Sequence, residues 1–118
     1  MKRIMCIVFW MLILFLGPLH ARENTESPQA LYKTYCWQCH GMQGNGMGVN
    51  IADMSVQPRD HTDAKQMSAR SDEELFKVIK EGGQSVGKSV LMPPWEGVLT
   101  DEEIQELVVY LRMLCKCK

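Results

Sequence analysis

The stretch that most constrains this chain is Cys36-Trp37-Gln38-Cys39-His40. Two cysteines separated by two residues, with a histidine directly after the second, are typical of a covalent attachment site for c-type haem. The spacing places the sulfurs one helical turn apart, so both can bond to the vinyl groups on one edge of a single porphyrin. The imidazole of His40 can then reach the iron as its proximal ligand. A chain with such a site must fold around a large, flat cofactor.

Two other kinds of site could use the same cysteines. A thioredoxin-like redox pair has this spacing, but it requires a βαβ context, and no parallel strands are predicted nearby. A structural zinc site is the stronger alternative, because Cys115 and Cys117 could complete a set of four thiolates with the motif cysteines. A single residue between two ligands is unusual for zinc, and the histidine would then have no role. Haem is the working hypothesis.

Residues 1–21 have the layout of a secretory signal peptide. A basic start precedes an apolar run, residues 4–16, that is too short for a comfortable membrane span. Cleavage after Ala21 is the preferred prediction, and an uncleaved anchor is the alternative because Leu19 is larger than the residue usually found at its position. We expect residues 22–118 to form a single domain with a short, cysteine-containing C-terminal tail. Its location would be the periplasm or another extracytoplasmic compartment.

The charge balance argues against a nucleic-acid partner. The chain has 13 basic and 14 acidic residues, and cleavage would remove two of the basic ones. The mature domain is therefore acidic, and haem propionates would add negative charge. We expect it to dock with redox proteins, a donor and an acceptor, through basic or mixed-charge surfaces. Contact with a membrane is expected only if the N-terminal segment stays attached.

A first helix is predicted immediately before the haem motif. Ser27 suits an N-cap and Pro28 suits the first helical position. The helix should run into Cys36 and end near Gly41, which places the motif on its last turn. Residues 41–67 show neither a helical nor a strand period, so we predict a long loop that wraps the haem edge. The apolar residues expected against the porphyrin are Val49, Ile51 and Met54.

Two further helices are predicted from capping boxes. Residues 71–74, Ser-Asp-Glu-Glu, begin a helix that Gly82 and Gly83 end. Residues 100–103, Thr-Asp-Glu-Glu, begin the last helix. Its apolar residues recur at helical spacing and are Ile104, Leu107, Val108 and Leu111. No alternating pattern is long enough to predict a strand, so the expected fold is all-α.

A second axial ligand is needed to close the iron site. Most methionines only fill gaps in apolar cores. Met92 differs because Pro93 and Pro94 fix the backbone that follows it, so its thioether can be held in one place. We predict that Met92 is the distal ligand, which is a cytochrome-type choice. His61 is the alternative iron ligand, although a surface position would be ordinary for it.

The chain resembles the class I cytochromes c, which are small single-haem electron carriers. The resemblance runs from Leu31 to Leu111 and rests on four features. These are the haem motif, the glycine loop after it (Gly44, Gly46 and Gly48), the segment Leu91-Met92-Pro93-Pro94-Trp95 and the last helix. It implies a cytochrome c fold of three to five short helices, with long loops wrapped around one covalent haem. The N- and C-terminal helices of this fold cross each other.

The resemblance also assigns roles to individual residues. It implies that Cys36 and Cys39 bind haem c by thioether bonds and that His40 and Met92 ligate the iron. It implies further that a backbone carbonyl group after the glycine loop, here at Val49, accepts a hydrogen bond from the proximal imidazole.

Two more residues are candidates for haem binding. Arg59 could neutralise a haem propionate, or it could be an ordinary exposed arginine. Trp95 could donate its indole N–H near a propionate, or it could simply pack in the core.

A low-spin iron with two protein ligands has no position for a substrate and suits outer-sphere electron transfer. We therefore expect an electron-transfer protein rather than an enzyme, which carries single electrons between respiratory redox proteins outside the cytoplasm. One alternative is a fixed haem subunit of a larger oxidoreductase. The other is a gas-binding or sensing haem protein, if Met92 is not a stable ligand.

The C-terminal cysteines lack the spacing and the histidine of a second haem site, so one haem is expected. Cys115 and Cys117 could form a local disulfide, remain free, or crosslink to a second copy or a partner. We favour the crosslink, because the protein is expected to be exported and its tail to be mobile.

Overall fold

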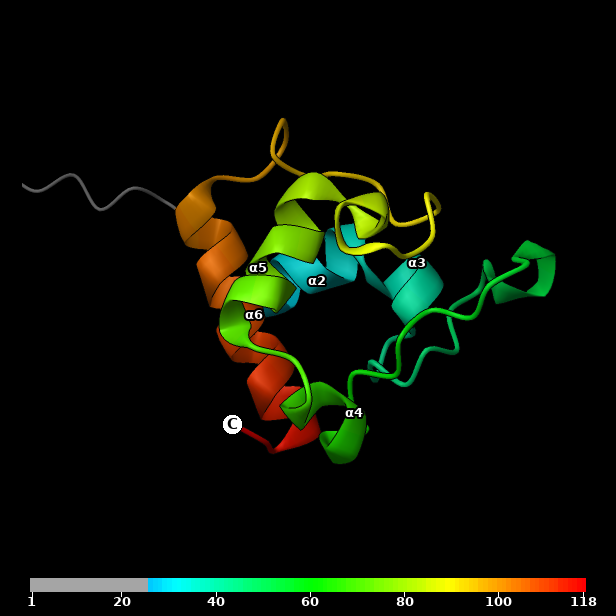
Figure 1. Ribbon diagram of the computed structural model, residues 1–118, viewed down its shortest axis with the longest axis horizontal. Helices are drawn as coiled ribbons and strands as arrows, with labels where there is room; N and C mark the ends of the chain where they lie inside the picture. The colour runs from blue at the N-terminus through cyan, green and yellow to red at the C-terminus, as the bar shows by residue number, and fades with distance from the viewer. Residues whose placement is uncertain (1–25) are drawn as a thin grey trace, which may run out of the picture.

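The computed structural model describes residues 26–118, and the predicted signal segment lies outside them. The elements in this part are α2 (Pro28–Tyr35), α3 (Trp37–His40), η1 (Ile51–Asp53), α4 (Ala64–Ser68), α5 (Asp72–Glu81), η2 (Gly83–Val86) and α6 (Asp101–Cys115), where η denotes a 3-10 helix (Figure 1). No strand occurs among these residues, so the all-α prediction is confirmed. Within the same range, no helix combines the length and hydrophobicity that a membrane crossing requires.

The first predicted helix is split at the haem motif. Its start is as expected, because the hydroxyl oxygen of Ser27 accepts a hydrogen bond from the N–H group of Ala30 at 3.3 Å. At Cys36 the backbone leaves regular helix geometry, with φ −112°, and α3 forms a separate turn of four residues. The N–H group of His40 still bonds to the carbonyl oxygen of Cys36 at 2.9 Å. The motif thus occupies a short turn of its own.

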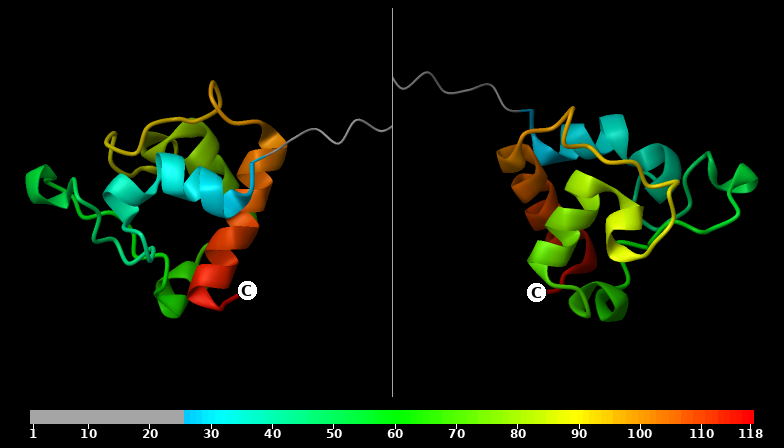
Figure 2. Two further views of the ribbon diagram at one scale, coloured as in Figure 1. Left: turned by 180° about the vertical axis from the view of Figure 1, so that it is seen from behind. Right: turned by 45° about the horizontal axis from the view of Figure 1, so that its top comes forward.

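Helices α5 and α6 are antiparallel and are joined at both ends (Figure 2). Both begin with the predicted capping boxes. Near the end of α5, Lys80 pairs with Asp101 at 2.7 Å, and near its start, Asp72 pairs with Arg112 at 2.8 Å. Ion pairs at the surface stabilise only modestly, so they mainly fix how the two helices are aligned. Most of the stabilisation comes from the apolar faces that meet between them.

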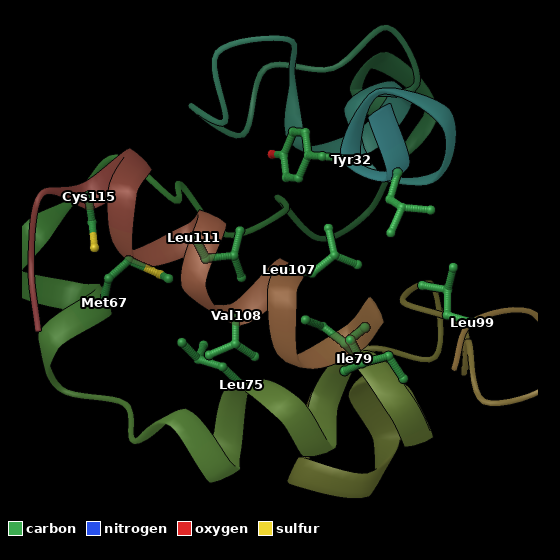
Figure 3. Close-up of a cluster of buried hydrophobic side chains, with 11 residues drawn as sticks. Tyr32, Met67, Leu75, Ile79, Leu99, Leu107, Val108, Leu111 and Cys115 are labelled. Atoms are coloured by element: carbon green, nitrogen blue, oxygen red, sulfur yellow. The ribbon is translucent and has the colours of Figure 1, made fainter. Parts of the chain in front are cut away.

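The apolar core lies where α6 meets α2 and α5 (Figure 3). The four predicted apolar residues of the last helix are all buried. The rings of Tyr32 and Tyr110 meet edge to face, with centroids 5.4 Å apart, where the first and last helices pack together. The core consists of Leu31, Tyr32, Met67, Leu75, Ile79, Leu99, Ile104, Leu107, Val108, Leu111 and Cys115. The packing of the N-terminal against the C-terminal helix is therefore as predicted.

The segment predicted as one loop, residues 41–67, ends in the short helix α4. The Asp63 carboxylate caps this helix, because it accepts hydrogen bonds from the backbone N–H of Gln66 at 2.9 Å and from its side-chain amide at 2.7 Å. An acidic N-cap followed three residues later by Gln is a helix-start signal, so the sequence did contain this information. Of the residues expected against porphyrin, Ile51 and Met54 are half-buried, whereas Val49 is 66% exposed.

Candidate functional site

His40 is held in one tautomer by the backbone. Its Nδ1 atom lies 3.0 Å from the carbonyl oxygen of Arg59. A carbonyl oxygen can only accept a hydrogen bond, so Nδ1 carries the hydrogen and Nε2 keeps a free lone pair. Burial lowers the pKa of His40, and the hydrogen bond to Arg59 opposes that shift only in part. The side chain is therefore a neutral imidazole whose Nε2 is available to a metal ion, as ligation requires.

The prediction that Val49 supplies this carbonyl is wrong. After Val49 the chain continues through η1 and a further loop, and only at Arg59 does it come back into contact with His40. Arg59 follows Pro58. The proline ring fixes the φ angle of Pro58 and so restricts the backbone one residue before the Arg59 carbonyl group. The family resemblance predicted the carbonyl group at Val49. The loop in this chain is longer, so the carbonyl group that is used lies ten residues further on, at Arg59.

Helix α3 is completed by a segment that we call the glycine strap, residues 46–50. The N–H groups of residues 46, 48 and 50 donate to the carbonyl groups of residues 40, 39 and 38, at 2.8, 3.1 and 2.9 Å. These carbonyl groups have no partner inside so short a helix, so the strap satisfies them. A Cβ atom on Gly48 would lie 2.6 Å from the carbonyl carbon of Cys39, which no real side chain tolerates. Glycine at this position therefore lets the strap fix the orientation of the motif.

Cys36 and Cys39 are free, half-buried thiols on this turn. Burial, with a contribution from the nearby Cys39, raises the pKa of Cys36 to about 12. A thioredoxin-type nucleophile needs a lowered pKa, because the thiolate is the reactive form. The environment of Cys36 thus disfavours the thioredoxin alternative and leaves two thiols on the turn that ends in His40.

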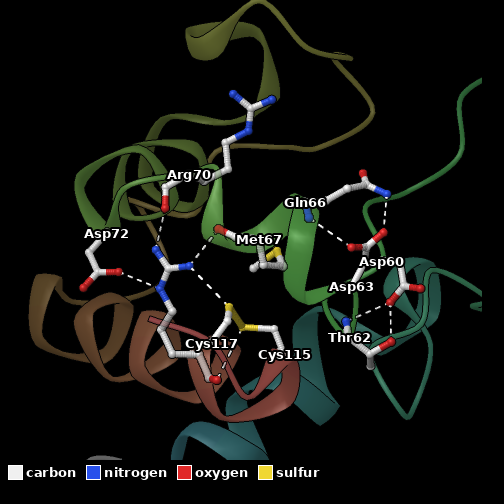
Figure 4. The surroundings of a disulfide bond; sticks show 10 residues. Asp60, Thr62, Asp63, Gln66, Met67, Arg70, Asp72, Cys115 and Cys117 are labelled. Atoms are coloured by element: carbon white, nitrogen blue, oxygen red, sulfur yellow. Dashed lines mark hydrogen bonds and ion pairs between the residues drawn. A yellow bond between two sulfur atoms is a disulfide. The ribbon is translucent and has the colours of Figure 1, made fainter.

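The four-cysteine zinc site is contradicted by the structure. Cys115 and Cys117 form a disulfide with each other at the end of α6, with Cα atoms 5.2 Å apart (Figure 4). Within residues 26–118, no group of three or more His, Cys, Asp or Glu side chains is placed to hold a metal ion. The favoured crosslink to a second copy or a partner is wrong for the same reason, since both sulfurs are already paired. The local disulfide is the alternative that the structure contains.

Met92 is fixed by its backbone to the end of α5. Its carbonyl oxygen accepts a hydrogen bond from the N–H group of Gly83 at 2.9 Å. A Cβ atom on Gly82 would lie 2.9 Å from the same oxygen, so glycine there allows the close approach. The side chain of Met92 is half-buried and packs against the core. In Figures 1 and 2 the loop that carries it lies on the same side of the molecule as α3, away from α6.

The other methionines in the described residues are poorer ligand candidates. Met67 is completely buried inside the core. Met42, Met47 and Met113 are about half exposed or more. Met54, which directly follows η1, is the remaining half-buried methionine. It is therefore the natural rival of Met92 and a matched control for it.

Arg59 and Trp95, the two other predicted haem-binding residues, both make contacts within the protein. The side chain of Arg59 donates a hydrogen bond to the side-chain oxygen of Gln66. The ring of Trp95 packs against that of Tyr35, with centroids 5.1 Å apart. What sequence reasoning missed is the main chain of Arg59, whose carbonyl oxygen orients His40.

His61 lies beside His40 rather than opposite it. The two imidazole rings are stacked, with centroids 4.2 Å apart and planes 18° from parallel. The two axial ligands of one iron approach it from opposite faces of the porphyrin, which rings stacked on each other cannot do. The Nδ1 atom of His61 is also engaged, at 3.0 Å from the hydroxyl oxygen of Tyr32. This arrangement disfavours His61 as the second ligand.

Comparisons with known proteins show which family and which solved structures this chain resembles. The protein-family model described as cytochrome C oxidase, cbb3-type, subunit III matches residues 23–111. The solved structure of the c-type cytochrome KustC0563 is similar, with a TM-score of 0.61 and 29% identity, over 75% of this chain and 98% of that one. A chain of the Kuenenia stuttgartiensis reducing HAO-like protein complex Kustc0457/Kustc0458 gives a TM-score of 0.60 and 29% identity, over 76% of this chain and 42% of that one. No curated protein sequence matches significantly.

Proposed function

Because the chain belongs to the c-type cytochrome family whose model is described as subunit III of cbb3-type cytochrome c oxidase, we propose that it is an extracytoplasmic carrier of single electrons. In this proposal one haem c is bound through Cys36 and Cys39, with His40 and Met92 as axial ligands. The observation that carries it is the hydrogen bond from Nδ1 of His40 to the Arg59 carbonyl, which leaves Nε2 free on the same helical turn as two free thiols.

The residues present fit such a cofactor. One-electron chemistry at iron is what haem supplies when it is bound. The two thiols hold one edge of the cofactor covalently, so it does not dissociate between encounters with partners. The Arg59 carbonyl holds Nδ1 of the proximal imidazole, and the glycine strap holds the helical turn that carries it. A thioether from Met92 favours the reduced state and fills the position where a substrate would otherwise bind.

The expected partners are redox proteins that donate and accept single electrons outside the cytoplasm. The acidic balance of the chain, 14 acidic against 13 basic residues before any cleavage, suits partners with basic or mixed-charge surfaces. Charge-guided docking of this kind is fast and brief, and it weakens as ionic strength rises.

Carbon monoxide binding tests the carrier proposal. The protein is produced in a host with haem-attachment machinery, reduced, and mixed with carbon monoxide. The parent should not bind the gas, because both axial positions are filled, whereas Met92→Ala should open one position and bind it. Met54→Ala is the matched control and should remain closed. Rapid binding by the parent would contradict the carrier proposal and favour a gas-binding or sensing protein.

A second candidate is a haem subunit fixed in a larger redox complex. The family description names an oxidase subunit, and one similar structure belongs to a protein complex. Size-exclusion chromatography of the native protein from its own cells separates the two functions. A carrier elutes at the mass of one small domain, whereas a fixed subunit elutes at a larger mass together with a stoichiometric partner.

A further inference from the structure

His61 and Tyr32 form a buried pair that the proposed function leaves without a role. His61 is 8% exposed, and apart from the members of the apolar core it is the one buried polar or charged side chain within residues 26–118. The hydroxyl group of Tyr32, itself 3% exposed, donates to Nδ1 of His61 at 3.0 Å when the imidazole hydrogen is on Nε2. Tyr32 is packed edge to face against Tyr110 of α6. His61 is therefore anchored through Tyr32 to the place where the first and last helices meet.

The backbone of His61 is fixed as well. Its N–H group donates to the carbonyl oxygen of Gly44 at 2.6 Å. Gly44 has φ +77°, and a Cβ atom there would lie 3.4 Å from both the Cβ atom of His61 and the hydroxyl oxygen of Tyr32. Three segments of the chain thus converge on His61, and its ring has little freedom to turn.

The face of the His61 ring lies against His40. Burial, with the neighbouring His40 and Arg59, holds the pKa of His61 well below its usual range, and burial also lowers the pKa of His40. The two rings meet face to face, so His61 limits the positions that the His40 ring can take.

One hydrogen bond restrains the plane of a ring but leaves it some angular freedom. The contact from Nδ1 of His40 to the Arg59 carbonyl restrains rotation of the ring about its bond to Cβ, but a hydrogen bond tolerates departures of about 30° from the linear geometry. A parallel ring against its face supplies the second constraint. Outer partners commonly orient a metal-ligating imidazole through its second nitrogen, as the Arg59 carbonyl does for His40, and the stacked ring of His61 adds to that restraint.

We propose that His61 is a positioning residue for the proximal ligand, whose ring, anchored by Tyr32, fixes the plane of the His40 imidazole relative to the haem. The inference rests on the proposed function, because it requires that His40 binds the iron. In an oxidised low-spin haem, the plane of the axial imidazole determines how unpaired spin is distributed around the porphyrin edge. His61 would thus determine which part of the edge couples best to a partner.

Proton NMR of the oxidised holoprotein tests this inference, because the hyperfine shifts of the haem methyl groups report the plane of the axial imidazole. His61→Leu removes the aromatic face and should change the order of the methyl resonances. His61→Phe restores a ring without nitrogen atoms and should bring back the parental order. Tyr32→Phe removes only the anchoring hydroxyl group and should shift the resonances in the same direction as His61→Leu. Tyr110→Phe makes the same chemical change one ring further away and should leave them in place.

The outcomes separate this inference from the proposed function. A His61→Leu protein that keeps the iron–thioether band and the parental methyl order would overturn the positioning role and leave the carrier proposal intact. Lower stability in both His61 variants, with an unchanged methyl order, would show a structural role only and would also overturn it. A parent without covalent haem would remove both proposals. If His61→Leu does not fold with its haem attached, the haem methyl shifts of Tyr32→Phe are compared with those of Tyr110→Phe. Identical shifts in these two variants would refute the anchoring role of the Tyr32 hydroxyl group.

Discussion

Gly48→Ala should destabilise the protein through the glycine strap. The new methyl group would lie 2.6 Å from the carbonyl carbon of Cys39, and even nearer to the carbonyl group of Gln38. Ordinary contacts of a Cβ atom begin at 3.4 Å. The obstructing atoms belong to the backbone of the haem motif and cannot swing aside as a flexible side chain would. The strap must therefore move away from α3.

The size of the effect follows from the hydrogen bonds that this movement breaks. Residues 46, 48 and 50 each donate one hydrogen bond to α3. A protein hydrogen bond contributes about 0.5–1.5 kcal/mol net, so losing all three should lower the free energy of unfolding by about 2–4 kcal/mol. The motif would also lose the contact that completes its helical turn.

Denaturant unfolding of the holoprotein, followed by far-ultraviolet circular dichroism, measures this change. Gly97→Ala is the matched control, because a Cβ atom on Gly97 would meet nothing within 4 Å. The control should be neutral or stabilising by up to about 1 kcal/mol, since alanine restricts the unfolded chain. A Gly48→Ala protein within about 0.5 kcal/mol of the parent, below the cost of even one hydrogen bond, would refute the role given to the strap.

Three further predictions concern other contacts. Arg112→Met should lower the free energy of unfolding by about 2–3 kcal/mol, because the guanidinium group donates to two backbone carbonyl groups and a carboxylate; Arg70→Met, at a more exposed ion pair, should cost under about 0.5 kcal/mol in the same denaturant series. The hydrogen bonds of the α4 cap lower the pKa of the Asp63 carboxyl group from its ordinary value of 3.8. The ionised carboxylate therefore stabilises the folded protein above that pH, and this stabilisation is lost as the pH falls through the lower pKa of the folded state. Asp63→Asn should therefore lose less stability than the parent on acidification, and equal losses would contradict this reading. Non-reducing electrophoresis should show a monomer, because Cys115 and Cys117 are paired with each other. A dimer band that disappears on reduction would contradict this pairing.

Sequence patterns gave the helix boundaries wherever a local rule decides them. Ser27, the two capping boxes and the apolar spacing of the last helix all act through residues three or four positions apart, so their consequences can be read from the chain. The same logic would have found α4 from Asp63 and Gln66. The fold class was predictable as well, because the Cys-x-x-Cys-His spacing pointed to a family with a known helical fold.

The contacts around His40 could not be predicted, because they join residues far apart in sequence. The carbonyl group that orients the ring belongs to Arg59, and its position depends on the length and path of the loop rather than on any side chain. The stack with His61 depends on the same loop and on Tyr32, whose hydroxyl group anchors it from another helix. The pairing of Cys115 with Cys117 was one of three open outcomes, since cysteine spacing alone does not determine a partner.

The most direct test of the account is the visible and near-infrared absorption spectrum of the protein exported from a host with haem-attachment machinery. We expect a haem that stays bound in denaturant and a weak iron–thioether band in the oxidised state. That band should disappear in Met92→Ala and persist in Met54→Ala. A covalent haem whose thioether band is lost in Met54→Ala instead, or is absent from the parent, would contradict the assignment of Met92. A protein that carries no haem at all would contradict the account as a whole.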